Sequence, residues 1–548
     1  MGRELFEFAH VRYESHVCPV QDQSGRPRVR RAPGARTRLP RFIAATLVAR
    51  GIDNPAAVHR FLAPSLERDW LDPYIIPGLS DVADALEAAV KRGDHILVFG
   101  DFDLDGISAT TVLTRGLRAL GAQATPFIPL RFEEGYALSQ AAITRACSFG
   151  PDFIVTVDCG IACKAEAAAV VEAGLGLAIT DHHEPVDLVP EGVPVADPKC
   201  DANCPSSILA GVGVALKLVQ VLGGRLGQPH LWRDFTDFAT LGTVADLMPM
   251  RDENRALVSD GIARMNAAPR PCIAALLATS GAADKPVSAT NLSFSVIPRL
   301  NAAGRMGDAQ LALDLLMADD FEEANRLATK LESVNDQRRA IEAELSEIAK
   351  AQAAEIYHGQ RARWCRARAG TGREGHRASR LVNTYGVPAC CSPSTATKRA
   401  AAAAAWARSA CSRLWKAHPT CSCASAGTMR PWASRCRPTS CRSSSVACAP
   451  TWTSCPRARS TRSSRSMRAS HSASSRWRTW RGWTRLAPFG QENPVPCFLA
   501  RDVTLTNCRA VGAEKNHFSC TLSDGRNTVA GIMFHCTDIE ALSTPTAW

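Results

Sequence analysis

Three aspartates at alternate positions, Asp101, Asp103 and Asp105, give this sequence its clearest chemical signal. The apolar run at 95–100 before them predicts a short buried strand, and the periodicity of 107–120 after them predicts a helix. Acidic side chains at alternate positions point the same way and repel one another, and a hard divalent cation with oxygen ligands relieves that repulsion. The competing interpretation is an acidic turn in which Asp105 caps the helix.

The same kinds of side chain return after later apolar runs. Residues 153–157 and 176–180 have the length and composition of buried strands, and acids or imidazoles follow both. The further candidates are Asp158, Asp181, His182, His183 and Asp246. A single acid after a strand is usually a cap, but several such sites in one domain favour a common centre.

The elements that must position these groups alternate between strands and helices. With a further strand predicted at 126–130, this order predicts an α/β fold built on a doubly wound parallel sheet. Open sheets of this class bind ligands at the carboxyl ends of their strands, where the candidates lie. Carboxylates with imidazole suit Mn²⁺, and carboxylates with water suit Mg²⁺. Two such ions sharing a carboxylate would make a two-metal hydrolase.

Charged residues, cysteines and tryptophans are unevenly distributed along the chain. The 548 residues are 46% hydrophobic and carry a formal charge of +11, which alone would suggest a polyanionic partner. Residues 375–491, however, contain 20 Lys or Arg and no Asp or Glu, so the remainder has a net charge of −9. The same segment holds 9 of the 21 cysteines and 7 of the 11 tryptophans. It therefore needs an explanation of its own.

The remaining segments give broader expectations. Residues 1–38 read as a flexible lead-in without a signal-peptide pattern, and no apolar run is long enough to cross a membrane, so a cytoplasmic protein is expected. The spacing of Cys200 and Cys204 fits a zinc site poorly, which favours reduced thiols. Residues 319–357 carry the apolar stripe of a long helix. Alternating residues at 503–505, 517–522 and 528–534 predict strands of a small barrel.

The ordered motifs of the chain resemble those of the DHH phosphoesterase superfamily, and within it the RecJ family of single-strand-specific 5′→3′ DNA exonucleases. The resemblance runs from about residue 39 to 357 and departs from the family mildly, for example with Asp197 where asparagine is common. The motifs that carry it are Asp101-Phe-Asp-Leu-Asp-Gly106, Glu134-Gly-Tyr136, Val157-Asp-Cys-Gly-Ile161, Asp181-His-His183, Leu209-Ala-Gly-Val-Gly213, Gly242-Thr-Val-Ala-Asp246, Glu253-Asn-Arg255 and Pro298-Arg-Leu-Asn-Ala-Ala-Gly-Arg305.

The resemblance implies a role for each matching residue. Two divalent ions, Mn²⁺ or Mg²⁺, would be held with Asp158 as the bridge, and Asp101 would lie beside them. His183 would contact the scissile phosphate. The implied ligands are Asp103, Asp105, Asp158, His182 and Asp246, and the implied nucleic-acid contacts are Arg131, Tyr136, Arg299, Asn301 and Arg305. Single-stranded DNA would be the substrate, with single-strand-binding protein and a helicase as partners.

After Ala389 the sequence loses any helix or strand rhythm. The family has a second core domain there, with a Gly-Gly-His-x-x-Ala-Ala-Gly signature that grips the nucleic-acid end. The codons of residues 427–433, read from the third base with chosen wobble bases, can encode Gly-His-Asp-Ala-Ala-Val-Gly. We therefore interpret roughly 390–480 as frame-shifted, with the frame restored by Leu486-Ala-Pro-Phe-Gly-Gln-Glu-Asn-Pro494, which resembles the start of the family's OB domain.

These observations predict five parts: a lead-in at 1–38, a DHH-type domain at 39–318, a connecting helix at 319–358, a disrupted second α/β domain at 359–484, and a partial OB-like barrel at 485–548. The function implied is metal-dependent hydrolysis of single-stranded DNA from its 5′ end to 5′-mononucleotides, in DNA repair and recombination. Two alternatives stay open: a DHH phosphodiesterase acting on short oligonucleotides or cyclic dinucleotides, and a catalytically impaired frame-shift product.

Overall fold

The structure is a computed structural model, and it describes most of the chain before residue 357 and shorter stretches after it. The described residues are 39, 41–356, 365–368, 389–392, 402–403, 467–468, 483–496, 498–499, 503–512, 515–523, 525, 528–534 and 536. The predicted lead-in and most of the segment interpreted as frame-shifted lie outside these residues. No helix in the described ranges is both long enough and apolar enough to cross a bilayer.

A five-stranded parallel sheet positions the candidate residues. Its strands are β1 (His95–Phe99), β2 (Gln123–Phe127), β3 (Phe153–Val157), β4 (Gly176–Thr180) and β5 (Val195–Ala196), in the spatial order β2-β1-β3-β4-β5. All neighbouring pairs are parallel, so the strands end at one edge. The third and fourth strands match their predicted ranges. β2 lies three residues before the range predicted for it, because an edge strand tolerates Pro126.

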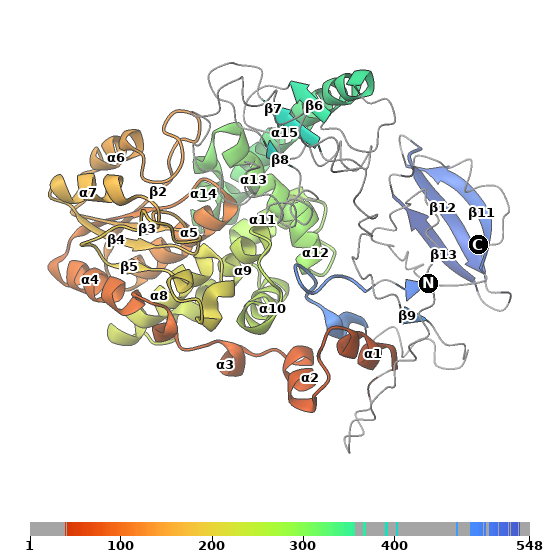
Figure 1. Ribbon diagram of the computed structural model, residues 1–548, viewed down its shortest axis with the longest axis horizontal. Coiled ribbons are helices and arrows are strands. Elements are labelled where there is room, and N and C mark those ends of the chain that lie inside the picture. Colours follow the sequence, from red (N-terminus) through yellow and green to blue (C-terminus); the bar gives the residue numbers. More distant parts are fainter. Residues whose placement is uncertain are drawn as a thin grey trace, which may run out of the picture. The chain divides into compact units, whose positions relative to one another are not determined.

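Helices cover both faces of this sheet, which confirms the doubly wound α/β fold (Figure 1). On one face, α6 (Gln140–Cys147) and α7 (Lys164–Glu172) pack their apolar residues onto the side chains of β1, β3 and β4. The opposite face is covered by α4 (Leu79–Arg92), α5 (Leu104–Ala119) and α8 (Gly211–Arg225). Because both faces are buried, the strands read as continuous apolar runs.

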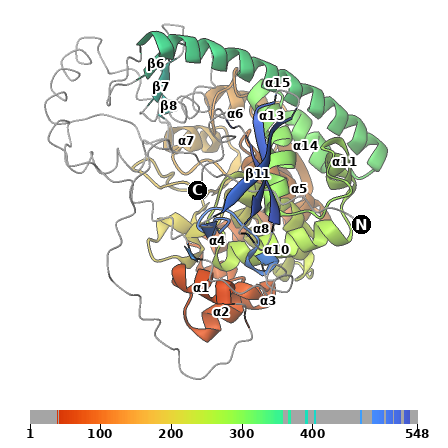
Figure 2. The ribbon, with the colours of Figure 1, turned by 90° about the vertical axis from the view of Figure 1, so that its right-hand side faces the viewer.

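A group of helices follows the sheet in the sequence. They are α9 (Thr236–Ala245), α10 (Asp252–Ala267), α11 (Pro271–Thr279), α12 (Ala289–Asn291), α13 (Ile297–Met306), α14 (Ala309–Met317) and α15 (Phe321–Ile356). A short π-helical stretch, Leu292–Val296, leads into α13. At 36 residues, α15 is the long helix predicted for this part of the chain, and α11, α13 and α14 pack along it (Figure 2).

The last described strands form a separate antiparallel sheet. β11 (Thr504–Val511), β12 (His517–Ser523) and β13 (Thr528–Met533) pair in sequence order, as the alternation of side chains predicted, and they bury Phe518 and Cys520. Shorter pairs also occur. They join β6 (Cys365–Arg368) to β7 (Ala389–Ser392), β7 to β8 (Ala402–Ala403), and β9 (Met467–Arg468) to β10 (Phe498–Leu499).

The chain forms two compact units. One combines residues within Met1–Trp70, Pro249–Ser259 and Arg462–Trp548, and the other combines residues within Leu71–Met248 and Asp260–Thr461. The first unit contains α1 (Arg41–Ala49), α2 (Pro55–Leu62) and α3 (Leu66–Asp69). Residues 39–70 thus group with C-terminal residues, whereas the sequence analysis placed them in one domain with the sheet.

Within the first unit, a buried arginine hydrogen-bonds to residues that lie far apart in the sequence. The guanidinium of Arg255 donates to the carbonyl of Phe61 and to those of Leu486, Ala487 and Pro488, and it lies 3.8 Å from the centre of the Phe61 ring. Burial lowers the pKa of Arg255 to about 10, so the side chain remains a cation at neutral pH. Leu486 completes the small core formed around Ile43 and Leu47. We name this arrangement the Arg255 clasp.

Arg255→Lys should open the clasp, because an ammonium cannot reach four carbonyls arranged around a planar guanidinium. We expect the first unit to lose roughly 3 kcal/mol of stability, since the carbonyls of Phe61 and Ala487 would lose this donor, whereas those of Leu486 and Pro488 also accept from Asn493. Limited proteolysis should then cut between the clasp and the sheet domain faster than in the wild type. The matched control is Arg251→Lys, which alters an ion pair with Glu492 whose side chains are both half exposed. Equal protection of the two variants would contradict the prediction.

Candidate metal centre

The aspartate loop begins at the carboxyl end of β1 and leads directly into α5. Asp103 caps this helix, since its Oδ1 accepts hydrogen bonds from the backbone N–H groups of Asp105 and Gly106 at 2.9 and 3.2 Å. The competing interpretation of the motif, in which Asp105 caps the helix, is therefore wrong. Because Asp103 serves the helix end, the Asp105 side chain is free to turn inward, and it is 2% exposed.

The N-terminus of α8 holds Asp105 in place. The carboxylate accepts from the N–H of Gly211 at 2.8 Å and from that of Val212 at 3.1 Å, and these are among the donors that a helix leaves unpaired at its start. Gly211 also allows the helix to come close, because a Cβ there would lie 2.5 Å from Oδ1 of Asp158. Two helix N-termini therefore meet at the carboxylates.

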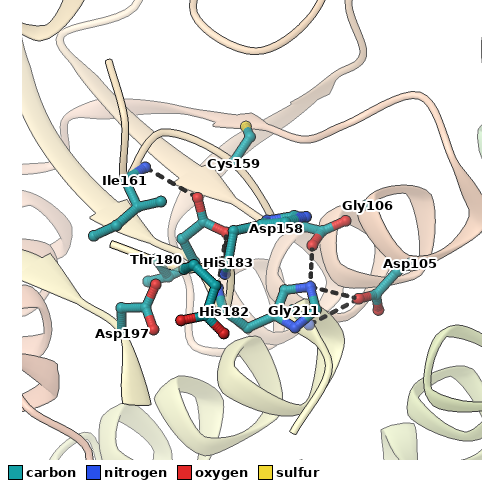
Figure 3. A network of polar contacts seen from close by, with 12 residues as sticks. Asp105, Gly106, Asp158, Cys159, Ile161, Thr180, His182, His183, Asp197 and Gly211 are labelled. Carbon is teal, nitrogen blue, oxygen red and sulfur yellow. Dashed lines mark hydrogen bonds and ion pairs between the residues drawn. The ribbon is translucent and has the colours of Figure 1, made fainter. Parts of the chain in front are cut away.

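His182 stands at the centre of the carboxylates. Its Nε2 lies 3.0 Å from Asp158 Oδ1, 3.6 Å from Asp105 Oδ2 and 3.7 Å from Asp246 Oδ2, and Figure 3 shows the imidazole beside Asp158 and Asp105. Its Nδ1 lies 3.1 Å from the carbonyl oxygen of Leu209. A carbonyl only accepts hydrogen bonds, so Nδ1 carries the proton and Nε2 presents a lone pair, as in metal-binding histidines.

A lone pair facing a carboxylate oxygen at this distance is repulsive unless a proton or a metal cation lies between them. Oδ1 of Asp158 is buried and accepts no hydrogen bond, and the same holds for Oδ1 of Asp101. Ligand atoms of Asp101, Asp103 and Asp158 lie within 4.8 Å of one another, as do those of Asp105, His182 and Asp246 and those of Asp158, His182 and His183. The donor set and its unpaired oxygens fit hard divalent ions.

The pKa shifts within the cluster also indicate a bound divalent cation. Burial, followed by the charge of neighbouring carboxylates, holds the pKa values of Asp105 and Asp158 well above the usual range, and the same causes raise the pKa of Asp246 to about 6. Burial lowers the pKa of His182 to about 3, so the imidazole is neutral. A bound cation would favour the ionised carboxylates and leave the neutral imidazole as a ligand.

Backbone strain gathers at the same place. In the described part of the unit that contains the sheet, three non-glycine residues have positive φ: Ala137 at 57°, Asp158 at 61° and Leu247 at 58°. Asp158 is a candidate ligand, Ala137 follows Tyr136, and Leu247 follows Asp246. Such conformations cost about 1–3 kcal/mol each and persist where the surroundings enforce them, typically at functional sites. No signal in the sequence indicates this strain.

The carboxylate of Asp181 holds neighbouring backbone groups and His183 in place after β4. The sequence motifs predict no such role for it. Its carboxylate accepts from the N–H groups of Ile161 and His182 and from Nδ1 of His183, the last at 2.7 Å. Burial, the largest single cause, disfavours its ionisation, but the hydrogen bond from His183, the charge of His183 and the N–H of Ile161 act together to lower the pKa of Asp181. In turn Asp181 raises the pKa of His183 to about 9 despite burial. Its place as the first residue after a strand could have indicated this role.

Asp246 comes from a helix rather than from a strand end. It follows α9 directly and caps its C-terminus, and its side chain is 36% exposed. The prediction that Asp246 follows a strand is therefore wrong, although Asp246 does lie beside His182 with the acids that follow strands.

The loop after β2 carries two of the predicted nucleic-acid contacts. Glu134 closes this loop, since its carboxylate accepts from the N–H of Leu130 and pairs with Arg145. The guanidinium of Arg131 then lies 4.7 Å from the centre of the Phe102 ring, which meets Tyr136 edge-on at 6.0 Å. Both predicted contacts therefore lie beside the aspartate loop.

The three predicted contacts on α13 are placed differently. Arg299 is 8% exposed and its guanidinium pairs with Glu332 of α15. Asn301 accepts a hydrogen bond from the N–H of Leu104, at the start of α5. Arg305 is half-buried, with its pKa lowered by burial, and the nearby charges include Glu342 and Asp103. Asn301 thus contacts the aspartate loop, and the charge of Asp103 in that loop acts on Arg305. Arg299 instead connects α13 to α15.

Two separate regions of the chain match models of known protein families. Residues 95–243 match the model of the DHH family, N-terminal domain, and residues 473–546 match that of the RecJ OB domain. A crystal structure of exonuclease RecJ bound to manganese is 35% identical, and the match covers 58% of this chain and 80% of that one, with a TM-score of 0.51.

The chain belongs to the RecJ family.

Other members support this assignment. RecJ of Thermus thermophilus in complex with Mn²⁺ is 26% identical, and that match covers 91% of this chain and 73% of the other, with a TM-score of 0.67. The single-stranded-DNA-specific exonuclease RecJ of Bacillus subtilis is 36% identical over 310 residues, which are 56% of this chain but 38% of the relative. The chain thus matches less than two thirds of the length of its curated RecJ relatives.

Asp246→Asn should stabilise the metal-free protein above pH 6. The folded-state pKa of about 6 exceeds the usual 3.8, so the stability linked to this carboxyl is lost as the pH rises through 6, and asparagine mimics the protonated form. We expect a gain of roughly 1 kcal/mol at pH 7.5, because exposure of the side chain screens the effect, and no gain at pH 4.

Thermal unfolding in EDTA from pH 4 to pH 8 would measure this difference. Added Mn²⁺ should reverse it, since the wild type keeps a ligand that the variant lacks. Asp284→Asn, at an exposed aspartate of the same unit, is the control. A variant that is less stable than the wild type in EDTA at pH 7.5 would refute the interpretation.

Proposed function

We propose that this RecJ-family chain hydrolyses phosphodiester bonds of single-stranded DNA from the 5′ end, with two divalent ions, Mn²⁺ or Mg²⁺, as cofactors. The observation that carries the proposal is that Nε2 of His182, whose Nδ1 faces the carbonyl of Leu209, lies within 3.7 Å of carboxylates from three separate elements. Buried acids with unpaired oxygens around a neutral imidazole have little structural use without cations.

The grouping of ligand atoms supports two ions rather than one. Asp101 and Asp103 gather with Asp158, while Asp105 and Asp246 gather with His182. Asp158 also lies 3.0 Å from His182, so it adjoins both groups and is the natural bridging ligand. When bound, the ions would supply an activated water and neutralise charge on the scissile phosphate.

Protein groups beside the ions would bind and orient the substrate. His183, protonated at neutral pH because Asp181 raises its pKa to about 9, would donate to a phosphate oxygen. Arg131 and Arg305 would bind further phosphates, and the aromatic ring of Tyr136 is exposed for stacking against a base. The region matching the RecJ OB domain would bind the strand beyond the site.

The proposal also covers the cellular role, location and partners of the chain. RecJ relatives are single-stranded-DNA-specific exonucleases, and a role of this chain in DNA repair and recombination would follow from that activity. The expected location is the cytoplasm, and the proposed protein partners are single-strand-binding protein and a helicase.

His182→Ala should slow hydrolysis strongly. We expect a loss of about 100- to 1000-fold in rate, the range seen when one group that stabilises the reacting charge is removed. The measurement is release of 5′-mononucleotides from a long single strand with Mn²⁺, compared with a dinucleotide substrate. His230→Ala, at an exposed histidine of the same unit, should be unaffected. A wild type that cleaves the dinucleotide but not the long strand would favour the short-substrate alternative, and hydrolysis by His182→Ala at the wild-type rate would exclude the proposed site.

The second candidate, a catalytically impaired product, is favoured by the absence of acids from residues 375–491. Resequencing the gene across codons 355–490 decides whether the shift exists. If it does, a chain with the frame restored should degrade long single strands about 100-fold faster than this one, because a second tethered binding module supplies that order of avidity. Equal rates for the two chains would show that the segment does not limit activity.

A further inference from the structure

Helix α13 lies against the aspartate loop at van der Waals distance. A Cβ at Gly304 would lie 2.2 Å from the carbonyl oxygen of Phe102, so only glycine allows this approach. One turn earlier on the same helix, Oδ1 of Asn301 accepts the N–H of Leu104 at 3.1 Å. These two contacts join α13 to the backbone that carries Asp103 and Asp105.

The Asn301 contact completes the first turn of α5. The first N–H groups of a helix have no partner within the helix. Here Asp103 satisfies those of Asp105 and Gly106, and Asn301 satisfies that of Leu104. These three hydrogen bonds hold the loop in the arrangement in which Asp103 is exposed and Asp105 is buried beside His182.

The other side of α13 is fixed to the long helix α15. Arg299 forms a two-pronged pair with the Glu332 carboxylate and also donates to the carbonyl of Ser295. The Glu332 side chain is 24% exposed and Arg299 is 8% exposed, so the pair is largely screened from water. A guanidinium engaged in this way is a structural connection, and it has few donors left for a phosphate.

We infer that α13 couples α15 to the metal loop, and that Asn301 and Arg299 are positioning residues for the metal centre rather than contacts to DNA. The inference rests on the proposed metal site. It replaces the expectation that these two residues line the path of the strand. Arg305 lies on the same helix, where the charges that act on it include those of Glu342, Arg131 and Asp103, and it keeps its proposed role as a phosphate contact.

Mn²⁺ binding to the full chain, measured by calorimetry and by electron paramagnetic resonance, tests the coupling without an activity assay. Asn301→Leu keeps the shape but removes the acceptor, and should weaken Mn²⁺ binding about 10- to 100-fold, the range for residues that orient metal ligands. Asn301→Asp keeps an acceptor oxygen and should bind Mn²⁺ as the wild type does. Circular dichroism shows whether each variant is folded.

A second pair of variants tests the connection to α15. Glu332→Ala should weaken Mn²⁺ binding, whereas Glu323→Ala should not, because Glu323 lies on the same helix but pairs with the exposed Arg326 of that helix. This pair keeps the inference testable if Asn301→Leu fails to fold. Equal Mn²⁺ affinity of Glu332→Ala and Glu323→Ala would overturn the coupling.

Single-stranded DNA binding in EDTA separates the two roles of Arg299. A positioning residue predicts that Arg299→Met binds DNA with the wild-type salt dependence, whereas loss of a phosphate contact would reduce the slope of log affinity against log salt by about one. A reduced slope would overturn the inference for Arg299. A wild type that fails to bind Mn²⁺ would instead overturn the proposed function itself, so the two failures are distinguishable.

Discussion

The contact between the lone pair of His182 and the unpaired oxygen of Asp158 is the constraint on which the sheet domain depends. When Asp158 is ionised, these two acceptors at 3.0 Å repel each other, and the surrounding carboxylates add to the repulsion, which is why the pKa of Asp158 is raised. The fold tolerates this arrangement because a rigid parallel sheet fixes the backbone beneath it and because helices close over it from both sides. The strained φ of Asp158 adds to the conformational cost of this geometry. The geometry that suits a bound cation therefore lowers the stability of the cation-free protein.

Helix ends provide the compensation. α5 and α8 both begin at the cluster, and their N-termini supply backbone donors and partial positive charge to Asp103 and Asp105. α13 adds the Asn301 side chain to the same turn. Glycines decide whether these helices can come so close, since a methyl group at Gly211 or Gly304 would overlap the acidic loop. Small residues thus contribute to the centre as much as the acids do, although they bind nothing themselves.

Sequence patterns predicted four of the five strands of the sheet, their parallel arrangement and the acids at their ends, because buried strands are continuous apolar runs and ligand groups follow them directly. They failed where tertiary contacts decide. The N-cap went to Asp103 because α8 draws Asp105 inward, and Asp246 reaches the cluster from a helix. Arg299 and Asn301 are residue types that also suit phosphate binding, so their type alone could not distinguish contact from support. The grouping of residues 39–70 with C-terminal residues depends on contacts that no local pattern encodes.

The Arg255 clasp has a consequence for synthesis on the ribosome. Arg50 and Asn493, which are hydrogen-bonded within it, lie 443 residues apart in the sequence. At about 5–20 residues per second, the N-terminal helices wait roughly 20–90 seconds before their partner emerges. During that time Ile43 and Leu47 lack the residue that completes their core. A nascent chain that lost its reading frame and met a stop codon would keep this apolar surface open to chaperones and proteases, whereas one that regains the frame can still cover it.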